Sequence, residues 1–351
     1  MKIMSEVFLG EVAKERKETS KENKGRYPIV GLEHLISEEI TLTAWEENKE
    51  NSFTKIFRKG DVLFGRRRAY LKKAVVAPFD GICSGDITVI QALPDKILPE
   101  LLPFIIQNDA LFDFAIGKSA GSLSPRVKWE NLKNFRFELP DLKEQSKLAS
   151  LLWSIDSTKK TYQKLIQKTD ELVKSQFIEM FKDTEKVKLS SIAEIVMGQS
   201  PPSDSYNEDR IGLPFYQGSA DFTDKYVTTR MYCTSPTRIA EAGDVLMSVR
   251  APVGTVNLTD KECCIGRGLA AIRSKGTSEY NEFLLYAFRT MEDEIVAMGQ
   301  GSTVLSINKD KLHGLLMPDA KKKQQEAFIS FVQQSDKSKY DYFSWMLGGA
   351  A

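Results

Sequence analysis

The chain has 351 residues, and its 49 Lys and Arg residues nearly balance its 48 Asp and Glu residues, which gives a formal net charge of +1. This length predicts two or three domains. No apolar run reaches the roughly 18 residues of a membrane span, and the opening residues MKIMSEVFLGEVAKERKE lack the apolar core of a signal peptide. The composition therefore excludes the membrane-spanning class, and any contact with DNA must depend on local positive charge.

The first half predicts an α/β domain. Its first twenty-odd residues are rich in Lys and Glu, and we expect them to be solvated. From Tyr27, short strand-like runs alternate with turn residues, as in FRKGDVLFG and KKAVVAPFDGICSGDITVIQAL. Helical periodicity returns over Leu98–Phe114, and the Gly/Ser turn GKSAGSLSPRV then leads to the strand-like segment FRFELP.

A single long helix is predicted for Pro140–Phe181. Asp141 and Glu144 have the spacing of a capping box at its start. No Pro or Gly interrupts the roughly 40 residues that follow, which make a helix about 60 Å long. One stripe of this helix, at spacings of three and four, consists of Leu148, Leu151, Leu152, Ile155, Tyr162, Leu165, Ile166, Thr169, Leu172 and Val173. Because a helix with a narrow apolar stripe does not fold alone, we expect a second helix alongside it.

The same order of segments begins again after Phe181, at an offset of about 180 residues. Gly60–Phe64 (GDVLF) matches Gly243–Met247 (GDVLM), and LPDLKEQSKLAS matches MPDAKKKQQEAF. In this second half we expect a short helix over Lys188–Gly198 and a longer helical segment over Phe283–Met298. A repeat of this length indicates duplicated domains, not a solenoid.

A second long helix, from Lys321 onward, carries Phe328, Phe331 and Val332 on one stripe and is the natural partner of the first. The predicted fold class is therefore α/β (α+β), with two similar domains separated by two long antiparallel helices that form a coiled-coil spacer with pseudo-twofold symmetry. Because the chain ends abruptly at SWMLGGAA, we interpret the second helix as truncated or tagged. The predicted segments are a first domain over 1–139, a central spacer helix over 140–183, a second domain over 184–317 and a distal spacer helix over 318–351.

Motifs for catalysis fail on inspection. Ser200–Ser203 (SPPS) resembles a box of amino-methyltransferases, but the fourth residue of that box must be aromatic to stack on a flipped base. Gly117–Ser119 lacks the upstream glycine of a phosphate-binding loop, and His34 and His313 lie far apart without neighbouring ligands. The four cysteines form no Cys-x-x-Cys pair and indicate buried, reduced thiols in a cytoplasmic protein. We therefore expect no catalytic residue, no metal site and no cofactor in this chain.

A cluster of positive charge around one aromatic ring follows the predicted strand GDVLF. Arginine and lysine at this density suit phosphate contact and the reading of guanine. The alternative is a solvated β-turn that keeps a sheet edge from pairing. The equivalent stretch of the second half, SVRAPVG, keeps only Arg250. The residues of this first candidate site are Arg66, Arg67, Arg68, Tyr70, Lys72 and Lys73.

Two further loop groups carry polar side chains that suit nucleic acid. The Gly/Ser turns offer hydroxyls, amides and a cation for a phosphate backbone, although ordinary glycine turns would have the same composition. In the second half, glutamines could pair with adenine edges, although simple loop chemistry explains that stretch almost as well. The turn residues are Ser122, Ser124, Arg126, Lys128, Ser302, Thr303, Asn308 and Lys309, and the second-half residues are Gln199, Ser200, Tyr216 and Gln217.

With these features the chain resembles the specificity (S) subunit of type I restriction–modification systems. In the second half the resemblance lies in GQSPPSDSYN, EAGDVLMSVRAPVGTVNL, GRGLAAI, MGQGSTVLSINKDKL and MPDAKKKQQEAF. In the first half it lies in KGDVLFGRRRAYLKKAVV and GSLSPRVKWENLKNFRFELPDLKEQSKLASLLWSID. The match covers nearly the whole chain, but the first half has a Lys/Glu-rich stretch where the second has GQSPPS.

The resemblance implies a non-catalytic DNA-binding subunit of a multisubunit DNA methyltransferase and endonuclease. Two target-recognition domains would each read one half of a bipartite site in double-stranded DNA. The helices would separate them like a ruler and dock methyltransferase (M) subunits, two in number, and restriction (R) subunits would complete the complex. S-adenosylmethionine would belong to the M subunits. Two alternatives stay open: a non-catalytic protein-interaction scaffold with paired helices, which the near-neutral charge favours, and a fragment of a fused restriction enzyme.

Overall fold

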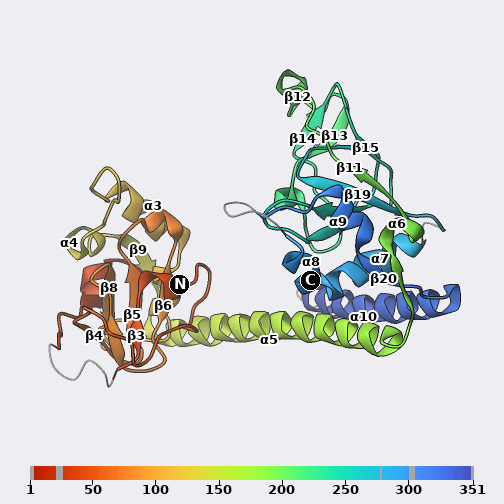
Figure 1. Ribbon diagram of the computed structural model, residues 1–351. Coiled ribbons are helices and arrows are strands. Elements are labelled where there is room, and N and C mark those ends of the chain that lie inside the picture. The colour runs from red at the N-terminus through yellow and green to blue at the C-terminus, as the bar shows by residue number, and fades with distance from the viewer. Residues whose placement is uncertain (1–3, 21–26, 277–278, 300–304, 349–351) are drawn as a thin grey trace. The chain divides into compact units, whose positions relative to one another are not determined.

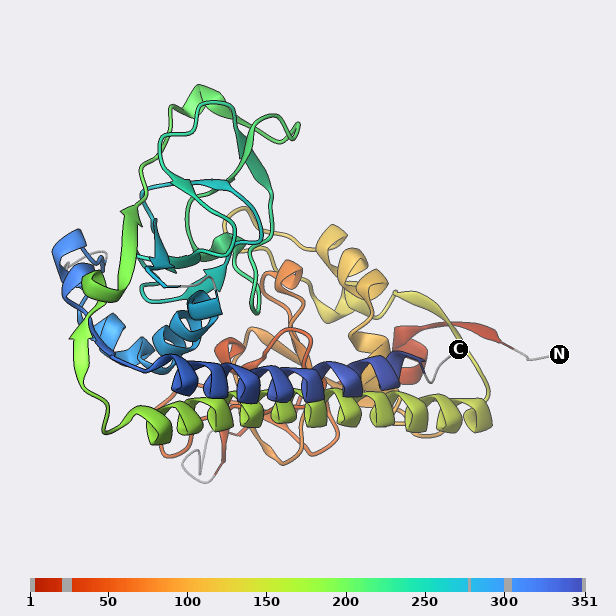
Figure 2. The same cartoon turned by 90° about the vertical axis from the view of Figure 1, so that its right-hand side faces the viewer.

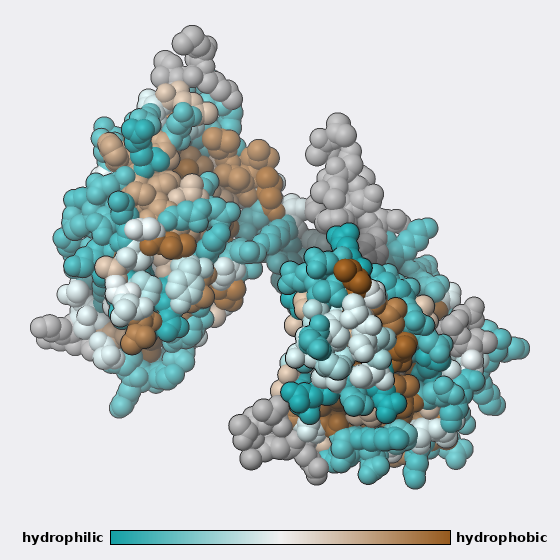
Figure 3. Space-filling model, turned by 90° about the horizontal axis from the view of Figure 1, so that it is seen from above, coloured by the Kyte–Doolittle hydropathy of each residue, from teal (hydrophilic) through white to brown (hydrophobic). Residues whose placement is uncertain are grey.

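The computed structural model describes residues 4–20, 27–276, 279–299 and 305–348 (Figure 1). The chain divides into two compact units, Met1–Tyr162 and Gln163–Ala351, and each has its own core. Among the described residues, no helix combines the length and the apolar character that a membrane span requires. On the face seen in Figure 3, hydrophilic residues predominate, with smaller hydrophobic patches between them.

The first unit contains two sheets and a two-stranded ribbon. The four-stranded sheet has the order β2-β8-β5-β6, the three-stranded sheet has the order β3-β7-β4, and β1 pairs with β9. The strands are β1 (Ser5–Phe8), β2 (Ala13–Glu15), β3 (Ile29–Val30), β4 (Lys55–Phe57), β5 (Val62–Gly65), β6 (Ala74–Val76), β7 (Gly81–Cys83), β8 (Ile87–Ala92) and β9 (Arg136–Leu139). The helices are α1 (Leu9–Val12), α2 (Leu102–Ile106), α3 (Asp109–Gly117) and α4 (Trp129–Leu132), with short 3-10 turns η2 (Leu32–His34) and η3 (Ala69–Leu71).

Three residues near the N-terminus belong to this core, so the expectation that this segment is solvated is wrong for them, whereas the other described residues up to Ser20 are exposed or partly exposed. Strand β1 pairs antiparallel with β9, with Ser5 opposite Leu139. Leu9, Val12 and Ala13 are buried. Charged residues between them face outward, and this mixture hides the apolar set from a simple reading of composition.

The second unit repeats this arrangement, with a five-stranded sheet in place of the three-stranded one. The four-stranded sheet has the order β11-β19-β16-β17, the five-stranded sheet has the order β12-β14-β13-β18-β15, and β10 pairs with β20. The strands are β10 (Lys186–Lys188), β11 (Ala193–Met197), β12 (Tyr206–Asn207), β13 (Leu213–Tyr216), β14 (Met231–Cys233), β15 (Ile239–Ala240), β16 (Val245–Ser248), β17 (Val256–Leu258), β18 (Cys263–Ile265), β19 (Leu269–Ser274) and β20 (Leu316–Pro318). The helices are α6 (Leu189–Ile192), α7 (Glu279–Thr290), α8 (Glu292–Ala297) and α9 (Lys309–Gly314), with 3-10 turns η4 (Ser203–Ser205) and η5 (Ser219–Asp221).

The four-stranded sheets of the two units have the same strand order, and β3-β7-β4 corresponds to β13-β18-β15, which confirms the predicted repeat. Each has one parallel pair, β3 with β7 and β13 with β18, among otherwise antiparallel described pairs. The GDVL motif enters β5 and β16 through the same turn, in which Gly60 and Gly243 have φ of +88° and +89°. Glycine is required in this turn because a Cβ at positive φ would be strained.

The short helix expected over Lys188–Gly198 is wrong in most of its length. Only Leu189–Ile192 is helical, and Ala193–Met197 forms strand β11, which pairs with β19 along five residue pairs. A pairing partner some 75 residues away in sequence overrides the local preference of this segment.

The long helix α5 (Leu142–Phe181) has the predicted length of 40 residues. At its start, the carboxylate of Asp141 accepts a hydrogen bond of 3.0 Å from the backbone N–H of Glu144, as a capping residue does. Half of the ten residues of the predicted stripe remain exposed, with Leu151 and Leu172 more than half accessible. The stripe was predicted to be buried by a partner helix, and for these residues that prediction is wrong.

The partner helix α10 (Lys322–Gly348) packs on the C-terminal part of α5 inside the second unit, and the two run antiparallel (Figure 2). The ring of Phe328 lies 5.3 Å from that of Phe177 and 5.9 Å from that of Phe181. Val173 and Val332 belong to the same buried cluster. Phe328 and Val332 were predicted from the sequence. Phe177 and Phe181 of α5 were not, because they lie beyond the end of the predicted stripe.

Candidate nucleic-acid interface

In the first unit, two separately predicted loops form one surface. The chain leaves β5 as Arg66, Arg67 and Arg68 and runs antiparallel to the Gly/Ser turn, with a bridge between Arg67 and Arg126. The N–H of Val127 donates to the carbonyl of Arg66 (3.0 Å), and the N–H of Arg68 donates to the carbonyl of Pro125 (2.8 Å). The arginine cluster and the Ser122–Lys128 loop are therefore one continuous site.

The second unit has the same bridge in the same register. The N–H of Ile307 donates to the carbonyl of Val249 (2.9 Å), and the N–H of Ala251 donates to the carbonyl of Leu305 (3.1 Å). Arg250 therefore lies where the middle arginine of the first unit lies. The predicted residues Ser302 and Thr303 lie outside the described residues, so this loop is described only from Leu305 onward.

A single carboxylate holds two arginines of the first unit. The Nε of Arg126 donates to Asp86 Oδ1 (2.7 Å), and Arg126 Nη2 and Arg67 Nη1 donate to Asp86 Oδ2 (3.3 and 3.4 Å). Arg67 Nε also donates to the hydroxyl of Ser124 (2.7 Å). The hydrogen bond from Arg126 keeps the pKa of the Asp86 carboxyl below its ordinary value, so the group is charged at neutral pH. Two cations on one anion leave a net positive charge at the surface.

The other cations of the first cluster differ in how free they are. Lys72 Nζ contacts Asp109 (2.5 Å), and Lys73 Nζ donates to the carbonyl of Leu32 (2.8 Å), so both are engaged within the domain. Arg68 and Tyr70 are exposed. Arg68 also has φ of +54°, a conformation that is uncommon for a bulky residue and that concentrates at functional sites.

Within the described part of the chain, one hydrogen-bond donor beneath this surface has no acceptor. The Nε of Arg66 is buried and has no hydrogen-bond partner among the described residues. Ser122 and Lys128 are exposed on the loop, and Leu123 between them is 91% exposed. A buried guanidinium N–H without an acceptor is costly, and this nitrogen has no surface that a ligand could reach unless the loop moves.

In the second unit, the predicted residues lie in three different environments. Gln199 is exposed, and Ser200 accepts a long hydrogen bond (3.5 Å) from the N–H of Arg267. Asn308 caps helix α9 by accepting from the N–H of Lys311 (2.9 Å). Lys309 is exposed at the start of that helix.

Tyr216 belongs to the core and not to the surface. Its ring is fully buried, and its hydroxyl forms a hydrogen bond of 2.6 Å with Thr229. Burial raises the pKa of this phenol to about 12. A ligand cannot reach the ring without opening the sheet, so we withdraw Tyr216 from the predicted contact residues.

The neighbouring Gln217 is exposed at the end of β13 and lines an open hollow of about 690 Å³. The hollow is also lined by Phe215 and Tyr206, whose rings stack with centroids 4.6 Å apart, and by Arg230. A carboxamide beside a stacked aromatic pair offers both hydrogen bonds and a flat apolar wall, which suit a base edge.

Neither metal chemistry nor disulfides are indicated in the part of the chain that the structure describes. Within it, no group of three or more His, Cys, Asp or Glu side chains is arranged to hold a metal ion. All four cysteines are free and buried, and burial raises the pKa of the Cys83 and Cys263 thiols to about 12. Buried thiols of this kind are inert.

Asp86, which holds Arg67 and Arg126 of the first unit, was not among the residues predicted from the sequence. It lies in the segment CSGDITVI, which the repeat aligns with IGRGLAAI, and the aligned residue is Gly268. The sequence shows that an acidic residue in one half aligns with a glycine in the other. It does not show that Arg67 and Arg126 both contact that acidic residue.

The comparisons with known proteins agree with this arrangement. The family described as "Type I restriction modification DNA specificity domain" matches residues 1–169 and 182–341. A putative type I restriction enzyme specificity subunit of Methanocaldococcus jannaschii is 28% identical over 354 residues, which cover 91% of this chain and 83% of that protein.

Two solved structures resemble the whole chain. One, described as "Structural basis underlying complex assembly and conformational transition of the type I R-M system", is 29% identical with a TM-score of 0.57 and covers 97% of this chain and 91% of its own. The type I restriction–modification S subunit from M. genitalium, at 13% identity, supports the fold alone, with a TM-score of 0.60 over 99% of this chain and 93% of its own. The chain therefore belongs to the family of type I restriction–modification DNA specificity domains and is a non-catalytic specificity subunit.

Proposed function

We propose that this chain recognises a bipartite site in double-stranded DNA and that each of its two domains reads one half of the site. The observation that carries the proposal is the bridge that recurs in both units, between Arg67 and Arg126 in one and between Arg250 and Ser306 in the other. The same backbone arrangement with different side chains suits two domains that recognise different DNA sequences. The backbone arrangement sets the position of the loop on the DNA, and the side chains determine which bases are recognised.

In this proposal the recognition domains are residues 1–139 and 184–317. The helices over 140–183 and 318–351 form an antiparallel coiled-coil spacer with pseudo-twofold symmetry. The 40 residues of α5 support a spacer of about 60 Å, which corresponds to roughly 18 base pairs of B-form DNA. The packing of Phe177 and Phe181 on Phe328 supports the pairing of the two helices.

The spacer also docks two methyltransferase subunits, which bring S-adenosylmethionine, and restriction subunits join them. Support comes from α5, where a row of aliphatic side chains remains 41–57% exposed. Rows of exposed apolar residues on a helix mark protein interfaces. The row consists of Leu148, Leu151, Ile155, Leu165 and Leu172.

The DNA contacts we propose are those that the structure leaves outward-facing or partly exposed. In the first domain Arg67, Arg68 and Arg126 grip the first half-site, with exposed neighbours on the same loops. In the second domain Arg250 and Gln217 lie at the corresponding surface. The further proposed contacts are Arg66, Tyr70, Lys72, Lys73, Ser122, Ser124, Lys128, Gln199, Ser200, Asn308 and Lys309. Ser302 and Thr303 stay proposed from the sequence alone, because they lie outside the described residues.

The test is to express the chain with the methyltransferase subunit of its own system, sequence the methylated adenines, and measure duplex binding at several salt concentrations. We expect one bipartite sequence to be methylated and the affinity to fall steeply with salt. Replacing Arg67 and Arg68 with Ala should abolish methylation. The matched variant with Lys59 and Lys96 replaced by Ala loses the same charge but should keep most activity, because these two exposed lysines lie outside the proposed contacts. Equal effects of the two variants would mean that the arginines act only through net charge.

The second candidate function is a protein-interaction scaffold with paired helices. The exposed aliphatic row on α5 favours it, since that row needs a protein partner in either case. The two functions differ in one measurement: a scaffold shows no salt-dependent, sequence-specific binding to duplex DNA when its partner subunits are present.

A further inference from the structure

Asp86 is held in place through both its backbone and its side chain. Its backbone carbonyl accepts from the N–H of Arg66 (3.0 Å), and its own N–H donates to the hydroxyl of Ser84 (3.2 Å). Its carboxylate holds the guanidinium groups of Arg67 and Arg126, as described above. The side chain of Asp86 is only 22% exposed, against 39% and 43% for the two arginines. The carboxylate therefore lies beneath two cations that face solvent.

The arginines keep donors available after these bonds are made. Arg67 uses Nε for Ser124 and Nη1 for Asp86, and its Nη2 has no hydrogen-bond partner among the described residues. Arg126 directs its Nε and Nη2 toward Asp86, and its Nη1 makes only a long contact (3.4 Å) with the carbonyl of Ser124. A guanidinium that is held along one edge presents its other donors in a fixed direction, as bidentate recognition requires.

The second unit lacks this carboxylate for a steric reason. Gly268 takes the place of Asp86, because the N–H of Val249 donates to its carbonyl (2.9 Å) just as that of Arg66 donates to the carbonyl of Asp86. A Cβ at Gly268 would lie 2.3 Å from the carbonyl oxygen of Gln217. No side chain fits there without moving the end of β13.

Two equivalent positions carry their polar side chain on different strand ends in the two units. Parallel pairing aligns Val30 with Cys83 in one unit and Tyr216 with Ile265 in the other. The residue after β3 is therefore Gly31 where the residue after β13 is Gln217. Each unit has one polar side chain and one glycine at this pair of strand ends, but the side chain comes from opposite partners.

We propose that Asp86 is the positioning residue of the first recognition domain, which orients Arg67 and Arg126 toward the bases of the first half-site, and that the second domain has no equivalent. The inference rests on the proposed function. In the first domain, recognition then depends on a buttressed arginine pair. In the second domain, Gly268 stands at the position of Asp86 and leaves room for Gln217, whose carboxamide contacts DNA directly.

The test uses the full chain with its methyltransferase subunit and the variant D86N, which keeps the shape of the side chain and removes its charge. Binding is measured to duplexes with an intact site, with a substitution in the first half-site, and with a substitution in the second. For D86N we expect discrimination at the first half-site to fall about tenfold or more, which corresponds to the loss of one well-oriented base contact. Discrimination at the second half-site should not change. Affinity for a duplex with both half-sites scrambled should stay equal or rise, because a negative charge has been removed.

Two further variants separate positioning from charge and from folding. D95N removes the same charge from an exposed loop position and should leave discrimination at both half-sites unchanged. D86E keeps the negative charge on a longer side chain and should retain part of the discrimination at the first half-site. The inference is overturned if D86N keeps first-half discrimination, or if it loses discrimination at both halves together with thermal stability. If the wild-type complex discriminates at neither half-site, the proposed function itself fails, and the inference fails with it.

Discussion

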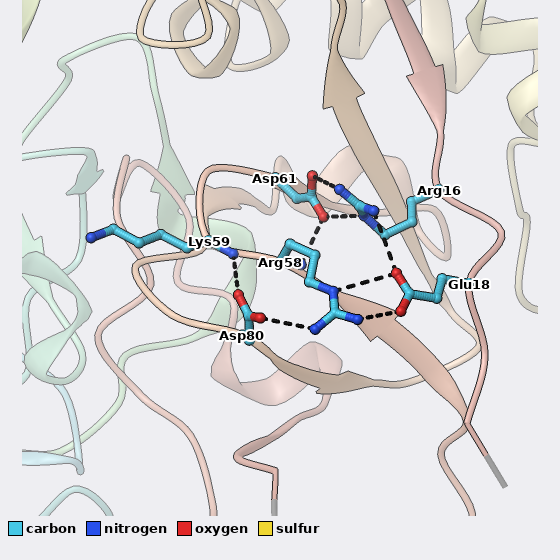
Figure 4. A network of polar contacts seen from close by, with 6 residues as sticks. All are labelled: Arg16, Glu18, Arg58, Lys59, Asp61 and Asp80. Atoms are coloured by element: carbon cyan, nitrogen blue, oxygen red, sulfur yellow. Dashed lines mark hydrogen bonds and ion pairs between the residues drawn. The ribbon is translucent and has the colours of Figure 1, made fainter.

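The guanidinium of Arg16 forms two parallel hydrogen bonds with the carboxylate of Asp61, from Nε to Oδ2 at 2.6 Å and from Nη2 to Oδ1 at 3.0 Å (Figure 4). Arg273 and Asp244 form the same pair in the second unit, at 2.7 and 2.9 Å. Both aspartates are buried and follow the positive-φ glycine of the GDVL turn. Arg16 directly follows β2, whereas Arg273 lies in β19, the counterpart of β8. The buried carboxylate is therefore the shared feature, and the arginine that pairs with it comes from a different position in each unit.

We predict that Arg16→Ala lowers the free energy of unfolding of the protein by about 3–5 kcal/mol, because it leaves Asp61 buried without its counter-charge. Urea denaturation measures the change. Arg58→Ala is the matched control. Arg58 pairs with Glu18 and Asp80 in the same network, but these side chains are 37% and 46% exposed, so the loss should stay below about 1 kcal/mol. Equal losses would show that burial of the Asp61 carboxylate does not set the cost.

The network in Figure 4 also predicts a dependence of stability on pH. Asp80 accepts hydrogen bonds from the backbone N–H of Lys59 (2.8 Å) and from Arg58 Nη1 (2.9 Å), and these lower the pKa of its carboxyl below the ordinary value of 3.8. Because the pKa is lower in the folded state, the stabilisation is complete above the unfolded pKa and is lost as pH falls through the folded one. Asp80→Asn should flatten the stability profile below about pH 4. The difference is small because the group is exposed, and a profile identical to that of the wild type would contradict the prediction.

The repeat could be predicted from sequence because its strongest markers are local. GDVLF and GDVLM specify a glycine turn and a buried strand within five residues, and the structure has β5 and β16 at these places. The segments that were predicted wrongly depend on distant partners. β1 pairs with β9, more than 120 residues later, and no local pattern encodes that pairing.

The candidate interface shows the same division. Composition alone singled out Arg66–Arg68 and the Gly/Ser turn as two candidates, because charge and small polar residues are visible in the sequence. The bridge between Arg67 and Arg126 joins them, and Asp86 anchors both, through contacts that span 40 residues or more for Arg126 and only 19 for Arg67. The fold brings these three residues together, and the sequence alone does not indicate that they are in contact.

The exposed row on α5 predicts a separation between assembly and stability. Replacing Leu151, Leu165 and Leu172 with Ser should reduce the amount of methyltransferase subunit that co-purifies with the chain, while the free energy of unfolding changes little. These side chains are 42–57% exposed and contribute little to the core.

Phe328→Ala is the complementary variant. It should lower the free energy of unfolding by about 3–5 kcal/mol, because the Phe328 ring is fully buried against Phe177 and Phe181. Quantified pull-down and urea denaturation of both variants separate the two effects. Unchanged co-purification of the Leu151, Leu165 and Leu172 variant would remove the row from the proposed docking surface.

The spacer is tested by changing its length. Thr161 lies on an exposed face of α5, where its hydroxyl donates to the carbonyl of Ser157 four residues earlier (2.9 Å). Inserting four helix-forming residues after Thr161 adds about one turn, or about 6 Å of rise, which corresponds to roughly two base pairs of B-form DNA. We expect the methylated sequence to keep both half-sites and to gain one or two base pairs in the gap. The half-sites stay the same because the loops that bear Arg67 and Gln217 are untouched by the insertion. Sequencing of methylated adenines from cells that express the inserted chain with its methyltransferase subunit gives both quantities at once, and a new half-site sequence with an unchanged gap would reject the spacer role of α5.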